Sequence, residues 1–543
     1  MAMTDFAPAT ASERRSRPPT LREWLAPPVP GGALLGWLGP LLVTVFAGVL
    51  RFTGLATPKA VVFDETYYAK DALALLKYGW EHNTVKDADK LLVADPKADI
   101  WADGASFVAH PPGGKWMIAI GEQLFGATPF GWRFMPALAG TLAVLILCRV
   151  ARRMTGSTLL GCAAGLLLAV DGLAFVTSRT ALLDVFVMFW VLAGFACIVA
   201  DRDRSRRQLA DRLDQDLERG TVSSYGPFLA HSWRWAAGIC LGLACATKWT
   251  GIFYIAAFGL MVVLWDYGAR RAAAVPKPFT GTLLFEAVPA FVQLVVVAAI
   301  TYLVSWSGWI FRPGGWGRGE VSGNWLARPF EAMPKLWKYH AEMLNFHTGL
   351  DSKHPYQSWP WDWPVLRRPV AFYYTEPKNA CGGGRCSSEI LGIGTPALWW
   401  GGLLALVVLA GLWLVLRDWR AGAILLGFAA GWLSWFPSAF GHRTMFLFYA
   451  TPMIPFLVLA VVLVLGYLIG PARQRSGAHL DVTGAAEQAP AVGPGARRVA
   501  GAALAGAFLL VVLVNFAYFY PILTADVLPY GSWHDRMWFS SWI

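Results

Sequence analysis

The chain has 543 residues, of which 56% are hydrophobic and only 15% are charged, and its mean hydropathy is +0.45. Soluble domains carry about a quarter charged residues, so this composition excludes an ordinary soluble protein. Apolar runs of helical length recur along most of the sequence, which also excludes a barrel of short alternating strands. The composition therefore indicates an all-α polytopic membrane protein.

The net charge of +11 does not indicate a nucleic-acid partner. The arginines gather in short segments between apolar runs, as the positive-inside rule expects of cytoplasmic connections. We therefore predict a membrane as the partner and no nucleic acid.

The apolar runs, taken in chain order, predict about eleven transmembrane helices. The first follows an arginine-containing tail and is too long for a cleaved signal peptide, so we interpret it as a retained helix. The predicted helices cover residues 31–52, 130–150, 157–175, 180–200, 234–248, 250–267, 284–307, 396–416, 421–438, 445–469 and 499–520.

The connections between these helices predict which side of the membrane each one faces. Their arginine excess places five connections on the cytoplasmic side with the N-terminus, and we expect them to be solvated loops. These connections are 151–156, 201–219, 268–274, 417–420 and 471–477. The stretch 471–498, rich in Gly, Ala and Pro, is typical of a flexible linker.

The opposite, extracytoplasmic side receives two long loops, 53–129 and 308–395, and nearly every unusual polar motif. This pattern divides the chain into five parts. They are a cytoplasmic tail (1–30), a transmembrane catalytic module with the first loop (31–307), the second loop (308–395), a second transmembrane module (396–520) and an extracytoplasmic tail (521–543).

The stretch DETYYAKDALALLKYGW (64–80) has the apolar spacing of an amphipathic helix. One interpretation is a helix on the membrane surface with solvated acids. Asp64 and Glu65, however, precede the helix near the end of the first span, where unpaired N–H groups favour an anion. These two acids are the candidate catalytic residues.

A second motif, AHPPGGKW, places His110 and Lys115 on either side of a stiff Pro-Gly turn. Its prolines and glycines are typical of an ordinary loop, but a stiff turn can also present both side chains to a substrate. The next residues, MIAIGEQLFG, predict another short helix.

Five cations lie at outer helix ends, and each of them alone can be a side chain that snorkels to the interface. Together they can line a pocket for a phosphate-bearing ligand, because Arg and Lys bind phosphate strongly in a dry site. They are Arg51, Arg133, Arg179, Lys248 and Arg443. Asp184 begins an apolar helix, where a carboxylate is costly, so we expect it to pair with an arginine.

The second loop holds SKHPYQSWPWDWP (352–364), rich in aromatic residues and proline. Such residues can form an interfacial belt or a platform for a sugar or a peptide. The polar edges of His354, Tyr356, Gln357 and Asp362 favour binding.

Two of the seven cysteines, Cys381 and Cys386 in CGGGRC, lie in this loop. The glycines between them allow the closure of a disulfide, and no second ligand pair completes a zinc site. We expect a disulfide and no metal.

The chemistry of the acids follows from their spacing. A glycoside hydrolase needs two carboxyl groups about 5 to 9.5 Å apart across the sugar, and adjacent residues do not provide this arrangement. Transfer from a sugar phosphate needs one base, because phosphate is a good leaving group, and cations that offset the developing charge. The outer face offers that combination.

Six motifs in order resemble the protein O-mannosyltransferases in their bacterial form. They are FDE after the first span, HPPxGK, SRxxLLD, KWxG, HPYxSxPxxWP and HRTMFLFYATPMIPF, spread over roughly residues 50 to 456. The resemblance implies the GT-C fold and transfer of mannose, with inversion, from polyprenyl-phosphate mannose to Ser or Thr of a secreted protein. It also implies an enzyme that needs no cofactor. It further implies a multi-pass protein of the cell membrane whose active site faces outward and which works at the secretion translocon.

By resemblance, Asp64 takes the proton of the acceptor hydroxyl, and Glu65 orients the acceptor or the base. Four of the cations, Arg51, Arg133, Lys248 and Arg443, are candidates for contact with the lipid phosphate, and His110 and Lys115 shape the donor site. Loop 308–395 is too short for the β-trefoil MIR domains of eukaryotic relatives. Many relatives have His-Tyr where this chain has Tyr449 and Ala450, so that position carries no role.

Two alternatives share part of this pattern. Another GT-C enzyme, which adds a lipid-linked sugar to a glycolipid or lipid A, has the acid and the cations but not HPPxGK and HPYxSxPxxWP together. A secondary transporter has internal repeats and polar residues at the bilayer midplane, whereas here the polar motifs gather at one face.

Overall fold

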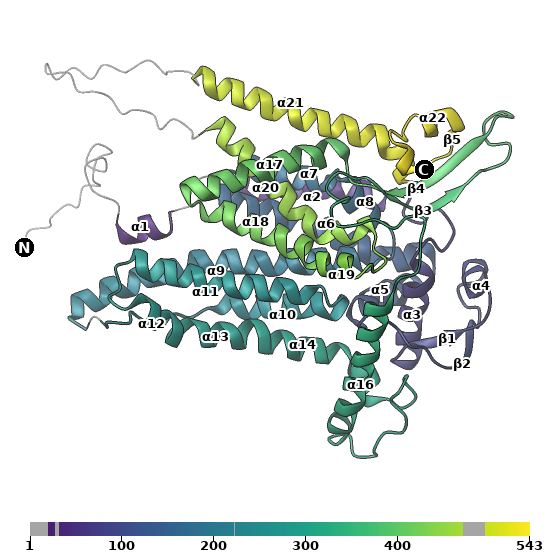
Figure 1. Cartoon of the computed structure of the whole chain (residues 1–543), viewed down its shortest axis with the longest axis horizontal. Helices are drawn as coiled ribbons and strands as arrows, with labels where there is room; N and C mark the ends of the chain where they lie inside the picture. Colours follow the sequence, from purple (N-terminus) through teal and green to yellow (C-terminus); the bar gives the residue numbers. More distant parts are fainter. Residues whose placement is uncertain (1–19, 28–31, 222, 471–494) are drawn as a thin grey trace, which may run out of the picture.

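The structure is a computed structural model, and it describes residues 20–27, 32–221, 223–470 and 495–543. Most of these residues lie in long helices that run side by side (Figure 1). The expected linker 471–498 and tail 1–30 fall largely outside the described residues.

Nine helical segments of the described chain are long and apolar enough to cross a membrane. Five of them contain α2 (Ala33–Phe52), α6 (Pro129–Thr155), α9 (Asp184–Arg219), α11 (Gly251–Ala272) and the run α12 to α14 (Pro278–Ser305). The other four contain α17 (Pro396–Leu416), α18 (Trp419–Trp432), α20 (Ile454–Ile469) and α21 (Ala496–Phe519). The all-α membrane class is thereby confirmed.

The two remaining predicted spans are also helical but shorter. Residues 157–175 form α7 (Thr158–Ala169) and most of α8 (Gly172–Thr177), and α10 spans Ser232–Thr247. α10 packs against α9 and α14, and α7 packs against α6 and α2. Every predicted run is thus helical, while the count of eleven spans stays a prediction.

The prediction of a solvated loop at 201–219 is wrong, because α9 continues without a break to Arg219. Leu209 and Leu213 recur at helical spacing on this extension and are buried against α1 (Leu21–Leu25). A short amphipathic contact of this kind stabilises a charged helical extension that its composition alone assigns to solvent.

The first long loop is mostly regular structure. It forms α3 (Glu65–Tyr78), β1 (His82–Thr84), α4 (Ala88–Ala94), β2 (Trp101–Ala105) and α5 (Gly113–Phe125). Strands β1 and β2 pair antiparallel, and α3 packs against α5, which in turn packs against α6. The two helices expected from the sequence are therefore present, and they rest on the bundle.

The second long loop is joined to the C-terminal tail through a small sheet. The loop contains α16 (Arg328–Gly349), β3 (Val370–Thr375) and β4 (Cys386–Gly392), and α15 (Ser307–Phe311) begins it. The sheet order is β3-β4-β5, antiparallel, with β5 (Leu528–Pro529) supplied by the tail ahead of α22 (Tyr530–His534). The structure joins Cys381 and Cys386 in a disulfide, with their Cα atoms 6.0 Å apart.

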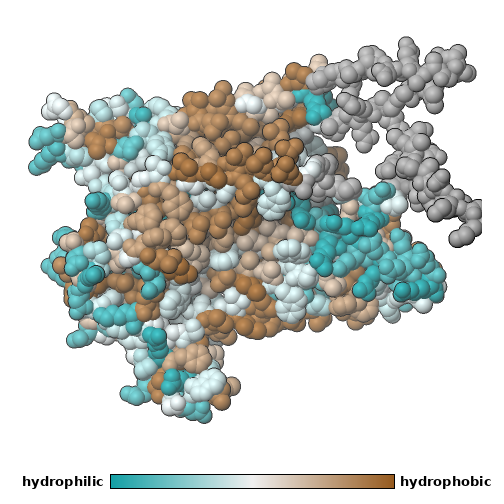
Figure 2. Space-filling model, turned by 180° about the vertical axis from the view of Figure 1, so that it is seen from behind, coloured by the Kyte–Doolittle hydropathy of each residue, from teal (hydrophilic) through white to brown (hydrophobic). Residues whose placement is uncertain are grey.

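The bundle has two unlike ends (Figure 1). Both long loops and the C-terminal tail gather at one, which we call the loop end; we call the other the arginine-rich end. An apolar surface lies between these more hydrophilic ends (Figure 2), and the buried core runs along α6, α7, α9 and α20. This arrangement agrees with the predicted sidedness, although which end faces the cytoplasm stays a prediction.

Candidate active site

Asp64 stands at the entrance of α3, on a turn that aromatic packing holds in place. Phe63 has φ +46°, a backbone conformation that bulky residues rarely adopt. Its ring stacks on Phe372 at 4.8 Å and meets Phe448 edge-on at 5.5 Å. Asp64 is half-buried, and its carboxylate makes no side-chain capping bond to α3. Backbone strain of this kind commonly marks a functional site. Because the carboxylate of Asp64 does not cap the helix, it is free to react.

Glu65 is the opposite of its neighbour, because it is fully buried and fully paired. Its two oxygens accept bonds from Arg133 Nε at 2.7 Å and Nη2 at 2.9 Å. The same oxygens accept the backbone N–H groups of Val62 at 2.9 Å and Ala181 at 3.0 Å. Glu65 therefore fixes the turn that carries Asp64 against α6 and against the segment before α9.

Four of the five predicted phosphate-binding cations donate to backbone carbonyls, and three of them, Arg51, Arg133 and Arg179, do so around the end of α2. Arg51 donates to carbonyl oxygens of α2 and α7, and Arg179 to four carbonyl oxygens at the end of α2 and just beyond. Arg133 donates to three more in residues 55–60, and all three arginines are buried. Arg133 and Arg179 thus hold the connection between α2 and α3, whereas Arg51 ties α2 to α7.

Lys248 and Asp184 form a buried ion pair with Nζ and Oδ2 2.7 Å apart. We expected an arginine as the partner of Asp184; that was wrong, because the end of α10 brings Lys248 to the start of α9. Lys248 Nζ lies 5.2 Å from the ring centre of Tyr449. This pair is the charged neighbour of Asp64.

Arg443 reaches the same region from the connection before α20. Its Nε donates to the backbone oxygen of His347 at 2.9 Å, and its guanidinium lies 5.7 Å from the ring centre of Tyr449. The His347 ring lies 5.2 Å from that of His110, and its Nε2 is 2.7 Å from the Ala109 oxygen. Neither Tyr449 nor His347 was predicted; a lone histidine at a helix end carries little sequence signal.

Lys115 lies deep between α3 and α5. It contacts Glu81, and its Nζ is 3.7 Å from Asp71 Oδ2. Lys115 is only 1% exposed, so its ammonium group pairs with these two carboxylates and does not face an open cavity. Its predicted role in shaping the donor site stays a prediction.

The SKHPYQSWPWDWP segment lines a shallow hollow of about 590 Å³, bordered by His354 and Gln357 among others. Tyr356 is half-buried beside it, and Asp362 accepts the backbone N–H of Trp359 at 3.0 Å. The His354 ring meets Phe446 edge-on at 5.0 Å, and Phe446 in turn contacts Phe63. The hollow is therefore linked through aromatic rings to the turn that holds Asp64.

The acidity of these groups follows from their surroundings. Burial raises the pKa of Asp64 to about 6; Lys248 opposes this shift and Asp184 adds to it. Burial also lowers the pKa of His110 well below its usual value, aided by Lys248 and His347. The pKa of His347 falls to about 4 through burial and Arg443. At neutral pH, the site thus offers an ionised base of raised basicity beside neutral imidazoles.

Ionisable groups also gather at the other end of the bundle. Within the described residues, His231, Asp266 and Glu286 have the spacing of metal ligands. Both ring nitrogens of His231 already contact carboxylates, of Asp201 and Glu286, and arginines pair with the acids. The chemistry of this donor set fits a buried ion-pair network better than a cation site.

A solved structure shares this fold over nearly the whole chain. The Saccharomyces cerevisiae protein O-mannosyltransferase Pmt1-Pmt2 complex bound to the sugar donor superposes with a TM-score of 0.68. The match covers 98% of this chain and 94% of that one at 16% identity. The two proteins therefore share one fold, a bundle of membrane-spanning helices with long loops at one end.

Sequence comparisons specify the family. Residues 41–299 match the profile of dolichyl-phosphate-mannose-protein mannosyltransferase, and residues 332–542 that of the C-terminal four TMM region of protein-O-mannosyltransferase. The chain is 36% identical to a polyprenol-phosphate-mannose--protein mannosyltransferase of Mycobacterium tuberculosis, over 94% of this chain and 92% of that one. A Mycolicibacterium smegmatis protein of the same name is 36% identical over 99% and 100%. The chain belongs to the protein O-mannosyltransferase family.

Proposed function

We propose that this enzyme transfers mannose from polyprenyl-phosphate mannose to Ser or Thr hydroxyls of proteins on their way out of the cell. The observation that carries the proposal is the carboxylate of Asp64, which makes no capping bond to α3 and is under the electrostatic influence of the Lys248–Asp184 pair. Membership of the family and the names of its actinobacterial relatives support the choice of donor and acceptor.

In the proposed step, the acceptor oxygen attacks the anomeric carbon of mannose as its proton moves to Asp64. The bond between that carbon and the phosphate oxygen breaks, and polyprenyl phosphate leaves with the electron pair. Attack from the side opposite the leaving group inverts the anomeric carbon. A base with a pKa of about 6 suits this task, because it is ionised at neutral pH yet accepts a proton readily.

Lys248 and Arg443 are the proposed partners of the departing phosphate. Lys248 Nζ and the guanidinium of Arg443 lie 5.2 and 5.7 Å from the ring centre of Tyr449, so the two cations border the same aromatic ring. Their positive charge offsets the charge that develops on the leaving oxygen. The step draws its charge compensation from these two side chains, so we include no cofactor in it.

Glu65, Arg133 and Arg179 have a positioning role in this proposal. Their hydrogen bonds end on the protein itself, and they fix the turn that presents Asp64. Of the two roles predicted for Glu65, orientation of the base is the one that its burial favours.

We further propose that the loop end faces outward from the cell membrane, because the arginine excess lies at the opposite end. An acceptor hydroxyl is easiest to reach while the polypeptide is extended, which favours a place next to the secretion translocon. The hollow beside His354 and Gln357 is the proposed platform for that polypeptide.

The test is transfer by the purified full-length protein. We expect a Thr-rich peptide to receive mannose from polyprenyl-phosphate mannose, with the anomeric configuration opposite to that of the donor. Arabinose and aminoarabinose carried on the same lipid serve as controls, with a glycolipid as the alternative acceptor. Transfer from one of those sugars, or to the glycolipid alone, would contradict the proposal.

A further inference from the structure

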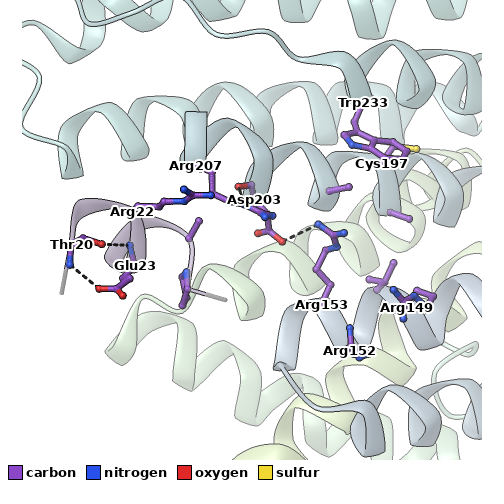
Figure 3. Close-up of a pocket in the computed structure, with 15 residues that line it drawn as sticks. Thr20, Arg22, Glu23, Arg149, Arg152, Arg153, Cys197, Asp203, Arg207 and Trp233 are labelled. Carbon is purple, nitrogen blue, oxygen red and sulfur yellow. Dashed lines mark hydrogen bonds and ion pairs between the residues drawn. The ribbon is translucent and has the colours of Figure 1, made fainter. Parts of the chain in front are cut away.

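A second cavity lies at the arginine-rich end of the bundle, opposite the loop end that holds the candidate active site. It has a volume of about 730 Å³ and is bordered by α1, α6, α9 and the start of α10 (Figure 3). Ligand sites commonly have volumes of about 300 to 1,000 Å³, so the cavity is large enough for a small polar head group.

Five arginines border this cavity, against two acids. Arg22 comes from α1, Arg149, Arg152 and Arg153 from α6, and Arg207 from α9 (Figure 3). The acids are Glu23 and Asp203, which leaves an excess of three positive charges. Arginines from three separate helices that border one space are the arrangement that binds a phosphate group through paired N–H donors.

Protein contacts hold these arginines in place. Arg149 stacks its guanidinium 3.9 Å from the ring centre of Trp37, and Arg152 Nε donates to Thr158 Oγ1 at 3.0 Å. Arg153 Nη1 lies 3.2 Å from Asp203 Oδ2, and Arg207 Nε donates to the Asp203 backbone oxygen at 3.0 Å. A guanidinium group has five N–H donors, and Arg153 and Arg207 are exposed as well as held in place. These two arginines are thus preorganised and accessible to an anion.

The cavity adjoins the lipid-facing surface of the bundle. Trp37 lies on α2, and the nearby side chains of Leu34, Leu35 and Leu38 on this helix are exposed. Trp233, which also lines the cavity, is exposed at the start of α10. Exposed tryptophans beside a basic pocket are typical of the level at which lipid head groups lie.

We propose that this cavity is a binding site for a phosphate-bearing anion, separate from the site of mannosyl transfer. The phosphate can belong to the head group of an anionic lipid or to a soluble phosphate compound. The same cation cluster serves either one, and bound phosphate fastens α1 to the bundle through Arg22. This inference does not depend on the proposed function.

The experiment compares three ligands on the purified full-length protein in a neutral detergent: dioctanoyl phosphatidylglycerol, dioctanoyl phosphatidylcholine and inorganic phosphate. The test variant combines Arg153→Gln with Arg207→Gln, two exposed positions on different helices. The matched control is Arg204→Gln, an exposed arginine of α9 that does not border the cavity.

We expect phosphatidylglycerol to bind, phosphatidylcholine not to bind, and the double variant to lose about tenfold in affinity while the control loses none. Hydrogen exchange of α1 should slow when the anion binds. Inorganic phosphate that binds as tightly as phosphatidylglycerol, with the same arginine dependence, supports the site and identifies a soluble compound as its ligand. Equal binding of the two lipids, or equal binding by the double variant and the control, overturns the proposal.

A salt titration of the unsubstituted protein tests the same claim without any variant. Binding to an arginine cluster weakens as salt screens the charges, so the affinity for phosphatidylglycerol should fall steadily with ionic strength. An affinity that does not change with salt overturns the proposal.

Discussion

Asp64 owes its acidity to a balance of burial and two nearby charges. Burial raises its pKa to about 6, Lys248 lowers it and Asp184 raises it. A general base must be deprotonated, so the activity that depends on it is present above about pH 6 and is lost as the pH falls through that value.

Lys248 can be used to shift this midpoint. In Lys248→Met, the positive charge that lowers the pKa of Asp64 is gone, so this pKa rises and kcat/KM should reach half its maximum at a higher pH. Lys248→Arg retains the charge and should keep the original midpoint. The measurement is the pH profile of kcat/KM, and an unmoved midpoint in Lys248→Met would contradict the electrostatic role.

We expect Glu65 to contribute to the stability of the folded protein and not to take part directly in the chemical step. Glu65→Gln leaves the buried guanidinium of Arg133 without its counter-charge, which should lower the free energy of unfolding by about 3 kcal/mol or more. The measurement is thermal unfolding of the purified protein. The control is Glu376→Gln, which breaks the exposed pair with Arg385 and should leave the melting temperature unchanged. Equal melting temperatures for the two variants would reject the role.

Sequence reasoning found the charged residues of the site but not all of their partners. The motifs identified Asp64, Lys248 and Arg443. In the structure, Lys248 acts electrostatically on Asp64, and both cations lie near the ring of Tyr449 and near His110. Arg51 instead donates to the carbonyl of Ala169, 118 residues away. A sequence indicates that a charge lies near a helix end, but the direction of its donors depends on how distant helices pack.

At the scale of elements, the small sheet fastens the second loop to the C-terminal tail. Trp533 Nε1 donates to Glu389 Oε2 at 2.6 Å, and burial raises the pKa of Glu389 to about 7. Strands β4 and β5 pair through Cys386 and Pro529, which lie far apart in the sequence. The sequence pattern does not predict this pairing, because β5 has only two residues and is too short to show the alternation of a strand.

Removal of this hydrogen bond should loosen the tail. Trp533→Phe keeps an aromatic ring but leaves the buried Glu389 without its donor, so backbone hydrogen exchange in β4 and β5 should quicken. Trp538→Phe is the matched control, since Trp538 is an exposed tryptophan of the same tail. Hydrogen exchange with mass spectrometry provides the comparison, and equal rates in the two variants would argue against this anchor.

The helices themselves were largely predictable, because a long apolar run has few alternatives in a membrane. The extension of α9 beyond residue 200 was missed, because its charges hid the spacing of Leu209 and Leu213. The pattern of buried leucines was present in the sequence, but its packing partner, α1, was not evident.

At the scale of the whole molecule, the two unlike ends predict how the protein sits in its membrane. Ser352→Cys at the loop end should react in intact cells with a maleimide that does not cross membranes. Arg204→Cys at the arginine-rich end should react only after the cells are opened. The unsubstituted chain is the control, because its five free cysteines are buried or half-buried. The reverse pattern of labelling would contradict the proposed orientation.

The most direct test of the account is Asp64→Asn, with Asp99→Asn as its control because Asp99 is an exposed acid of the same loop. Asparagine keeps the shape of the side chain but cannot take the proton of the acceptor. Transfer of mannose to a Thr-rich peptide should fall by a factor of about 10² to 10⁴ in Asp64→Asn and remain normal in Asp99→Asn. Affinity for polyprenyl-phosphate mannose should stay within about twofold of the unsubstituted enzyme. Turnover that persists in Asp64→Asn would contradict the assignment of Asp64 as the base.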